Sequence, residues 1–195
     1  MPDLTDEELM VSFQQGDAAA FERLFERYRV PLFNYLLRLL SYQRESAEDV
    51  LQNIFIKLAR SRDLYDSRAP FRPWIYTITR NHGLNHLRSR AAVKARMTVS
   101  ADEELIGPSG ERSAHEWAGP DDTFGAIASR EEGCRLMRII ERLTSPAKEI
   151  FLLRAVDGLS HEEIARMLNL NPATVRTHFH RARAQLCRLL ANPAP

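Results

Sequence analysis

The side chains best suited to bind a charged partner lie on one predicted helix near the end of the chain. Residues 171–195 contain four arginines and no Asp or Glu. The inward face of this helix is expected to be an apolar stripe at helical spacing, made of Val175, Phe179, Ala182 and Leu186. The opposite face then presents polar and basic groups from Arg176, Thr177, His180 and Arg181. A donor-rich face without acidic neighbours is typical of a helix that enters the major groove of DNA.

A further helix is predicted just before this one. Ser160 and Glu163 form a capping box at its start. Pro172 suits the first position of the helix that follows, with Asn171 as its N-cap. Two helices joined by a tight turn are the pattern of a helix-turn-helix. An ordinary helical hairpin with a solvated basic face is the alternative, but solvated faces normally mix the signs of charge, so DNA binding is favoured.

A second group of donors lies on a long helix expected at about residues 72–90. Residues 67–101 contain seven Lys or Arg and no acid. The candidate nucleic-acid contacts on this helix are Tyr76, Arg80, Asn81, Asn85 and Arg88. Aromatic rings interleaved with positive charge suit single-stranded nucleic acid, because bases stack on the rings and phosphates pair with arginine. The polar loop at residues 61–69 is a candidate pocket for an unstacked base.

The aromatic residues of this region have two interpretations. Phe71 and Trp74 are assigned mainly to the core, whereas Tyr65 and Tyr76 are divided evenly between the core and the nucleic acid. Gly83 is unusual inside the helix, where glycine costs about 1 kcal/mol relative to alanine.

The remaining segments also show helical spacing, and none alternates with the period of a strand. Helix starts are expected at Thr5 (in a capping box with Glu8), Asp17 and Ser46. Pro31 is expected to break or kink the second helix.

The helical pattern disappears in the middle of the chain. Residues 102–122 hold seven acids and one arginine. Helical spacing resumes near Ser129, where Leu136 and Met137 begin a new stripe. The sequence therefore predicts an all-α protein, with helical domains at residues 1–96 and 129–195 and a flexible acidic linker at residues 97–128.

The composition argues against a polybasic nucleic-acid binder, a metal-binding protein that uses cysteines, and a secreted or membrane-spanning protein. The 195 residues carry a formal net charge of only +1, so the chain as a whole is not a polybasic binder. Cys134 and Cys187 are far apart and fit no metal spacing. The first residues, MPDLTDEELM, show no signal peptide, and no apolar run approaches the roughly 18 residues of a membrane span. A cytoplasmic protein without membrane insertion is expected.

Neither catalysis nor metal binding is predicted. His82 and His86 have an i, i+4 spacing that suits zinc, but no third ligand accompanies them. The carboxylates cluster at helix starts and in the linker, and no nucleophile motif or glycine-rich phosphate loop is present. We therefore expect no cofactor, no metal and no catalytic residue.

Three segments, in this order, resemble an extracytoplasmic-function (ECF) sigma factor. They are DVLQNIFIKLAR at residues 49–60, FRPWIYTITRN at residues 71–81, and the helix-turn-helix that includes LTSPAKEIFLLRAVDGLSHEEIA at residues 143–165. The resemblance implies a sigma-two-like bundle and a sigma-four-like helix-turn-helix domain. It also implies that the protein binds RNA polymerase core, directs it to promoter DNA, and is held inactive by an anti-sigma factor.

The resemblance also implies roles for individual residues. Asp49, Gln52 and Asn53 match the positions that dock on the polymerase clamp helices. Tyr76, Arg80, Asn81, Asn85 and Arg88 lie on the helix that reads the minus-ten element, and residues 62–68 match the loop that accepts a flipped base of the non-template strand. Arg176, Thr177, His180 and Arg181 match the helix that reads the minus-thirty-five element.

Two other functions remain open at this point. A self-sufficient helix-turn-helix regulator would bind duplex DNA without polymerase, but it would not need the second basic and aromatic surface. An enzyme acting on nucleic acid would show turnover with a divalent metal, and none is expected.

Overall fold

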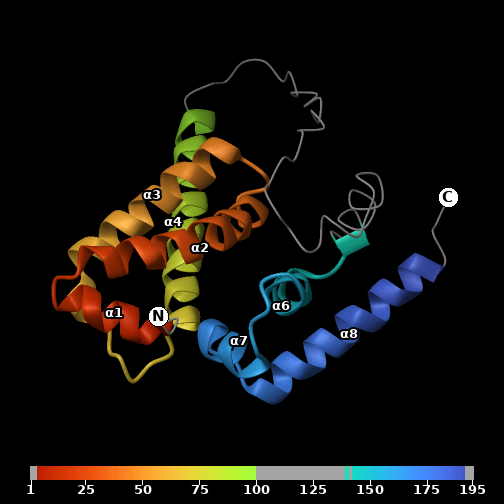
Figure 1. Ribbon diagram of the computed structural model, residues 1–195. Coiled ribbons are helices and arrows are strands. Elements are labelled where there is room, and N and C mark those ends of the chain that lie inside the picture. The colour runs from red at the N-terminus through yellow and green to blue at the C-terminus, as the bar shows by residue number, and fades with distance from the viewer. Residues whose placement is uncertain (1–3, 100–138, 141, 192–195) are drawn as a thin grey trace. The chain divides into compact units, whose positions relative to one another are not determined.

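The computed structural model describes residues 4–99, 139–140 and 142–191. The described residues form helices and no strand, so the expected all-α class is confirmed. In chain order the elements are α1 (Asp6–Gln14), α2 (Ala18–Leu39), α3 (Arg44–Arg60), the short 3-10 helix η1 (Arg62–Leu64), α4 (Phe71–Val99), α6 (Ser145–Ala155), α7 (His161–Leu168) and α8 (Pro172–Ala191) (Figure 1). The acidic segment at residues 102–122, and the helical stripe expected to begin near Ser129, lie outside the described residues.

The chain divides into two compact units. One consists of Met1–Ala95 and Leu159–Pro172, and the other of Arg96–Gly158 and Ala173–Pro195. The domain limits expected from the sequence, at residues 96, 128 and 129, stay a prediction.

Three of the expected helix starts are confirmed. In α1 the Thr5 hydroxyl accepts from the Glu8 amide at 3.2 Å, and the Glu8 carboxylate accepts from the Thr5 amide at 2.8 Å. Ser160 and Glu163 make the same reciprocal pair at the start of α7. Asp17 caps α2 by accepting from the Ala19 amide at 2.9 Å. Each cap satisfies backbone donors that the helix itself leaves unpaired.

Other expectations about helix limits are wrong. Ser46 is not the cap of α3, because the chain turns through Ser41 and Tyr42 in left-handed conformations and the helix begins two residues before Ser46. Helix α2 continues through Pro31, so the proline does not break it, and buried side chains lie on both sides of it; a kink at Pro31 stays a prediction. Helix α4 runs to Val99 rather than ending near residue 90, since the sequence AAVKARM contains good helix formers and no breaker.

The core of the first unit contains a cluster of aromatic rings. Phe71 is 1% exposed, and its ring centroid lies 5.3 Å from that of Tyr28, 5.6 Å from that of Tyr65 and 5.7 Å from that of Trp74. Tyr35 of α2 meets Tyr76 of α4 edge-on at 5.6 Å. This packing joins α2 to the first turns of α4.

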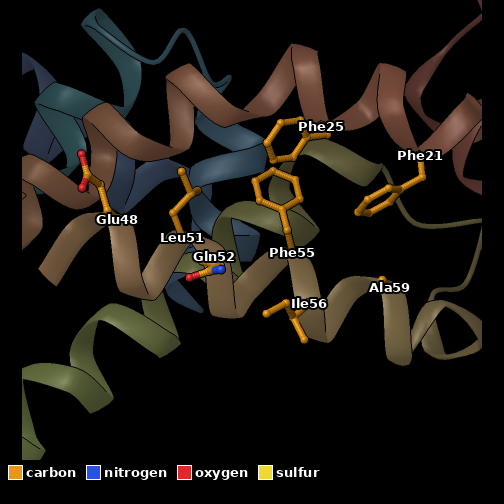
Figure 2. Close-up of a pocket in the computed structure, with 8 residues that line it drawn as sticks. All are labelled: Phe21, Phe25, Glu48, Leu51, Gln52, Phe55, Ile56 and Ala59. Carbon is orange, nitrogen blue, oxygen red and sulfur yellow. The ribbon is translucent and has the colours of Figure 1, made fainter. Parts of the chain in front are cut away.

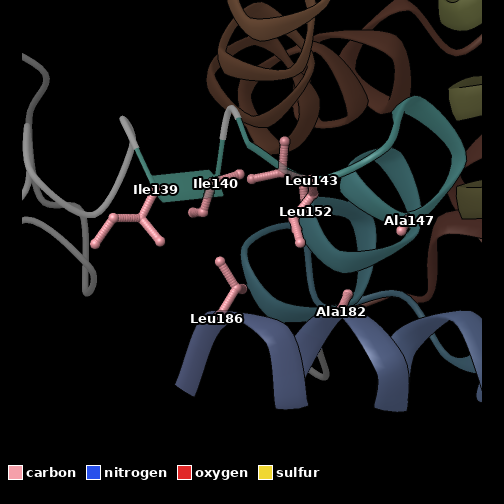
Figure 3. Packing of buried hydrophobic residues seen from close by; sticks show 7 residues of the cluster. All are labelled: Ile139, Ile140, Leu143, Ala147, Leu152, Ala182 and Leu186. Atoms are coloured by element: carbon pink, nitrogen blue, oxygen red, sulfur yellow. The ribbon is translucent and has the colours of Figure 1, made fainter. Parts of the chain in front are cut away.

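The second unit has its own small apolar core (Figure 3). Side chains from α6 and α8 meet there with Ile139 and Ile140, and the buried set is Ile139, Ile140, Leu143, Ala147, Leu152, Ala182 and Leu186. The rings of Phe151 and Phe179 stack at 5.8 Å with planes 16° apart. The inward stripe expected for α8 is confirmed, with Phe179 half-buried.

The structure explains the glycine inside α4. A Cβ atom at Gly83 would lie 2.5 Å from the Leu39 Cδ2 atom and 3.3 Å from the Leu36 Cδ2 atom. Glycine therefore allows α4 to approach α2 closely at this point.

We predict that Gly83→Val lowers the free energy of unfolding by about 1–3 kcal/mol, because a filled interface must move to accept the added methyl groups. Ser89→Val places the same side chain on an exposed position of α4 and should change this free energy by less than about 0.5 kcal/mol. Urea unfolding followed by circular dichroism measures both. Equal effects of the two substitutions would contradict the close-approach explanation.

Candidate nucleic-acid interface

Helix α8 presents the face that the sequence predicted for duplex DNA. Arg176, Thr177, His180 and Arg181 are all exposed, whereas Val175 and Ala182 on the other side are 0% and 1% exposed. The Thr177 hydroxyl donates to the Ala173 carbonyl of its own helix at 2.9 Å. Toward a ligand, Thr177 can therefore offer only an acceptor and its methyl group, while the two arginines offer donors.

The turn before α8 is set by local geometry. Helix α7 ends at Asn169, which adopts a left-handed conformation with φ of 53°. The Leu170 amide donates back to the Ala165 carbonyl at 2.9 Å, which closes the end of the helix. Three residues then separate α7 from α8, so two helices follow each other along the chain with a short turn between them, as in a helix-turn-helix.

Helix α4 presents the second predicted donor face. Asn81, Asn85 and Arg88 are exposed, and Arg80 is half-buried. The Arg88 guanidinium donates to the Asn85 side-chain carbonyl at 3.4 Å, so these two side chains lie together on the surface. Exposed amides can pair with base edges, and an adjacent guanidinium can pair with phosphate.

Tyr76, which is among the candidate contacts predicted from the sequence, does not belong to this donor face. Its side chain is 0% exposed and packs against Tyr35 in the core, so its ring cannot stack on a base. Tyr65 is likewise buried, at 4% exposed, and its ring lies 4.9 Å from that of Trp74. Both tyrosines, which the sequence divided evenly between the two interpretations, belong to the core.

The loop between α3 and α4 has a fixed base and an exposed tip. Leu64, in η1, is 79% exposed, and Asp63, Ser67 and Arg68 are exposed beside it. The Tyr65 hydroxyl donates to the Ala69 carbonyl across the loop. Burial, followed by the nearby charges of Glu7, Asp6 and Asp66, raises the pKa of Tyr65 to about 12, so this hydroxyl stays a donor further into the alkaline range than an ordinary tyrosine.

Helix α3 carries the predicted docking residues on its outer face. Asp49, Gln52 and Asn53 are exposed, and the Asn53 amide donates to the Asp49 carbonyl at 2.9 Å. An apolar groove of about 380 Å³ lies beside them between α2 and α3 (Figure 2), lined by Phe21, Phe25, Glu48, Leu51, Gln52, Phe55, Ile56 and Ala59. The rings of Phe25 and Phe55 meet at 4.8 Å, yet Phe25 and Ile56 remain 37% and 42% exposed.

Comparisons with known proteins identify the family. Residues 24–93 match Sigma-70 region 2, and residues 135–186 match Sigma-70, region 4. The ECF RNA polymerase sigma-E factor of Escherichia coli (strain K12) is 31% identical over 180 residues, which cover 92% of this chain and 91% of that protein. The RNA polymerase sigma factor CarQ of Myxococcus xanthus is 30% identical over 181 residues, which cover 93% of this chain and 95% of that protein.

This chain belongs to the ECF sigma factors. It therefore directs RNA polymerase to promoters in the initiation of transcription. The resemblance inferred from the three sequence motifs is confirmed, and a self-sufficient helix-turn-helix regulator would not account for the match to region 2.

Solved structures share the fold of this sigma factor. CnrH, solved in complex with the cytosolic domain of CnrY, aligns with a TM-score of 0.65 and 24% identity over 97% of this chain and 99% of that chain. The sigma factor RpoE from Bartonella quintana, solved in complex with the anti-sigma factor NepR, aligns with a TM-score of 0.61 and 20% identity over 89% of this chain and 98% of that chain.

Sequence reasoning missed several residues of this sigma factor's surfaces. Phe25 and Ile56 belong to the groove, but their exposure depends on how α2 and α3 cross, which helical spacing does not give. Gln14 of α1 donates from its amide nitrogen to the Arg62 and Tyr65 carbonyls, at 2.9 Å each. Nothing in the sequence links Gln14 to a loop 48 residues away, and α1 precedes the match to region 2.

The histidine pair on α4 does not gain further ligands in the structure. Within the described ranges, no group of three or more His, Cys, Asp or Glu side chains is placed to hold a metal ion. Burial, followed by the charge of Lys57, lowers the pKa of His82, so its neutral form is favoured. Among the described helices, none is long and apolar enough to cross a membrane.

Proposed function

We propose that this sigma factor holds promoter DNA with two separate helical faces while a third face docks on polymerase core. The minus-thirty-five face is Arg176, Thr177, His180 and Arg181 on α8, and the minus-ten face is Arg80, Asn81, Asn85 and Arg88 on α4. The docking face is Asp49, Gln52 and Asn53 on α3. The observation that carries the proposal is that two acid-free, donor-bearing helix faces lie in different units of one chain.

The two DNA faces suit different forms of the same DNA. Helix α8 carries two exposed arginines, Arg176 and Arg181, on one face. Such a face suits the edges of bases in a duplex major groove, where arginine recognises guanine with two hydrogen bonds. The segment between α3 and α4, residues 61–70, is called the 61–70 loop. The exposed amides of Asn81 and Asn85 lie on α4, which follows this loop, and the loop and the amides together suit bases that have left the stack. We infer a sigma-two-like domain at residues 1–96 and a sigma-four-like domain at residues 129–195, joined by the acidic segment between them.

In this account, strand separation is driven by capture and not by catalysis. A base that leaves the duplex is held by the 61–70 loop and the minus-ten face, and its binding free energy offsets the cost of unstacking. This requires no nucleotide hydrolysis, so we assign the sigma factor no catalytic residue, metal or cofactor. Its site of action is the cytoplasm, where promoter DNA and polymerase meet in bacteria.

The apolar groove between α2 and α3 supports the assignment of the docking face. Gln52 belongs to both surfaces, so a helical partner lying along α3 would cover the exposed parts of Phe25 and Ile56 as well. A contact of this kind has an apolar centre with a polar rim, the usual arrangement at stable protein interfaces. We propose that polymerase core fills the groove, and that an anti-sigma factor competes for the same faces. The structurally similar RpoE from Bartonella quintana was solved in complex with an anti-sigma factor, NepR.

Run-off transcription with core polymerase on a library of promoters tests the function as a whole. The sigma factor should make core polymerase initiate on a subset of templates that share two sequence elements at a fixed spacing. Initiation on no template, at saturating amounts of the sigma factor, would contradict the proposal.

For the minus-thirty-five face, we predict that Arg176→Ala weakens binding of the holoenzyme to the upstream element by about 1–3 kcal/mol, because a two-bond contact to a base is lost. Affinity for polymerase core should not change. Arg188→Ala is the matched control, since the Arg188 guanidinium is exposed in the last turn of α8 and bonds to the Ala184 carbonyl. An equal loss with both variants would show a general charge effect and not base recognition.

For the minus-ten face, Asn81→Ala should reduce the equilibrium constant for open-complex formation by about tenfold, the effect of one or two lost hydrogen bonds to a base. Fluorescence of 2-aminopurine in the non-template strand measures opening. Ser89→Ala, also exposed on α4, should leave opening unchanged. Unchanged opening with Asn81→Ala would remove Asn81 from the face.

For the groove, Ile56→Ser should lower affinity for polymerase core by about fivefold, because apolar surface that docking buries is lost. Leu190→Ser changes a side chain of similar exposure, 45%, near the end of α8 and should not affect core binding. Fluorescence anisotropy of labelled sigma factor titrated with core polymerase gives both values. The groove assignment fails if the two variants bind core equally well.

A further inference from the structure

We propose that Gln14 of α1 is a positioning residue for promoter opening, because it holds the 61–70 loop in the shape that accepts an unstacked base. The inference rests on the function proposed for this loop. It assigns to α1 a part in DNA opening although α1 precedes the match to Sigma-70 region 2 and contributes no residue to the three proposed faces.

In the contact between Gln14 and the loop, one side-chain amide forms hydrogen bonds with two backbone carbonyls. The Gln14 amide nitrogen donates to the Arg62 carbonyl and to the Tyr65 carbonyl, each at 2.9 Å. These carbonyls lie at the start of η1 and just after it, so the single side chain spans the turn. Glutamine is suited to this because its amide carries two N–H donors.

Two further contacts from α1 hold the same loop. The Arg62 guanidinium lies over the ring of Phe13, with its central carbon 5.4 Å from the ring centroid. At the other end of the loop, the Glu7 carboxylate accepts from the Phe71 amide at 2.8 Å, where α4 begins. The contacts of Phe13, Gln14 and Glu7 place one face of α1 along the base of the loop.

Helix α1 is itself fixed, so it can act as a support. The Asp6 carboxylate accepts from the Arg27 guanidinium at 2.8 Å and from the Tyr28 hydroxyl, both on α2. The Arg27 guanidinium also donates to the Leu4 carbonyl at 2.8 Å. The backbone that carries Gln14 is therefore held in place by the packing of α1 on α2.

The anchored base of the loop contrasts with its tip. Leu64 is 79% exposed, and Asp63, Ser67 and Arg68 are exposed as well, so these side chains are accessible to a base. A loop held in shape before binding loses less conformational entropy when a base enters. Loss of the Gln14 contacts would leave the turn at η1 less restrained and weaken base capture, although Gln14 itself does not touch the base.

The test compares two adjacent glutamines in the full chain bound to core polymerase. Gln14→Met keeps the length of the side chain but removes both donors, whereas Gln15→Met makes the same change at an exposed position. On a promoter found by run-off transcription, Gln14→Met should lower the equilibrium constant for open-complex formation roughly tenfold, the scale of two lost hydrogen bonds. Gln15→Met should leave it unchanged. Affinity for core and binding to the upstream element should not change with either variant.

A second measurement separates loop positioning from a general loss of structure. Single abasic sites are placed in turn along the non-template strand of the minus-ten element. At the captured position, wild-type opening should fall, and Gln14→Met should cause no further loss there, because the base that the loop would hold is absent. At other positions the two losses should add. If the methionine variant does not fold, as judged by its thermal unfolding, Gln14→Ala removes the same donors in its place.

The outcomes distinguish this inference from the function on which it rests. If wild-type opening is insensitive to every abasic site, the base-accepting role of the loop is wrong. If the wild type is sensitive but Gln14→Met opens the intact promoter normally, Gln14 is not a positioning residue and the role of the loop stands. A loss with Gln14→Met that is equal on intact and abasic templates would also overturn the inference.

Discussion

The ring of Phe71 is the contact on which the proposed DNA-opening surface depends. It is buried against Tyr28 of α2, Tyr65 of the loop and Trp74 of α4, so three segments are fixed by one side chain at the first position of α4. The Phe71 amide also donates to Glu7 of α1. The direction of α4 and the position of the loop before it are therefore determined together. A DNA surface made from both requires this, because an error of about 1 Å in the placement of one part would weaken the other.

Each proposed DNA face is the outer side of a helix whose inner side is tightly packed. On α8, Phe179 stacks on Phe151, and Ala182 and Leu186 are buried. Because these residues fix which side of the helix faces the core, the polar and basic residues on the opposite side face outward. On α4, Gly83 brings the helix against Leu36 and Leu39 of α2, which turns the asparagine side toward solvent. Positive charges gathered on one face without acidic neighbours repel one another, and this cost is consistent with a function in binding phosphate.

The sequence predicted those features that depend on neighbouring residues. The caps at Thr5, Asp17 and Ser160 and the inward stripe of α8 follow from short-range spacing, and the structure confirms them. The sequence does not predict the start of α3 correctly, because the left-handed turn at Ser41 and Tyr42 contains no glycine, the residue that usually indicates such a turn. The sequence left open whether Tyr76 belongs to the core or contacts DNA, because Tyr35, against which its ring packs, is far away in sequence. Gln14 and Ile56 were missed for the same reason: contacts between distant segments decide their roles.

The most direct test of the account measures unpaired thymines in the non-template strand with permanganate, without nucleotides. Core polymerase and this sigma factor are mixed with a promoter that run-off transcription has identified. Thymines in the minus-ten element should become reactive only when both proteins are present, because captured bases hold the strands apart without hydrolysis. Reactivity with core polymerase alone, or none with both proteins at saturation, would contradict it.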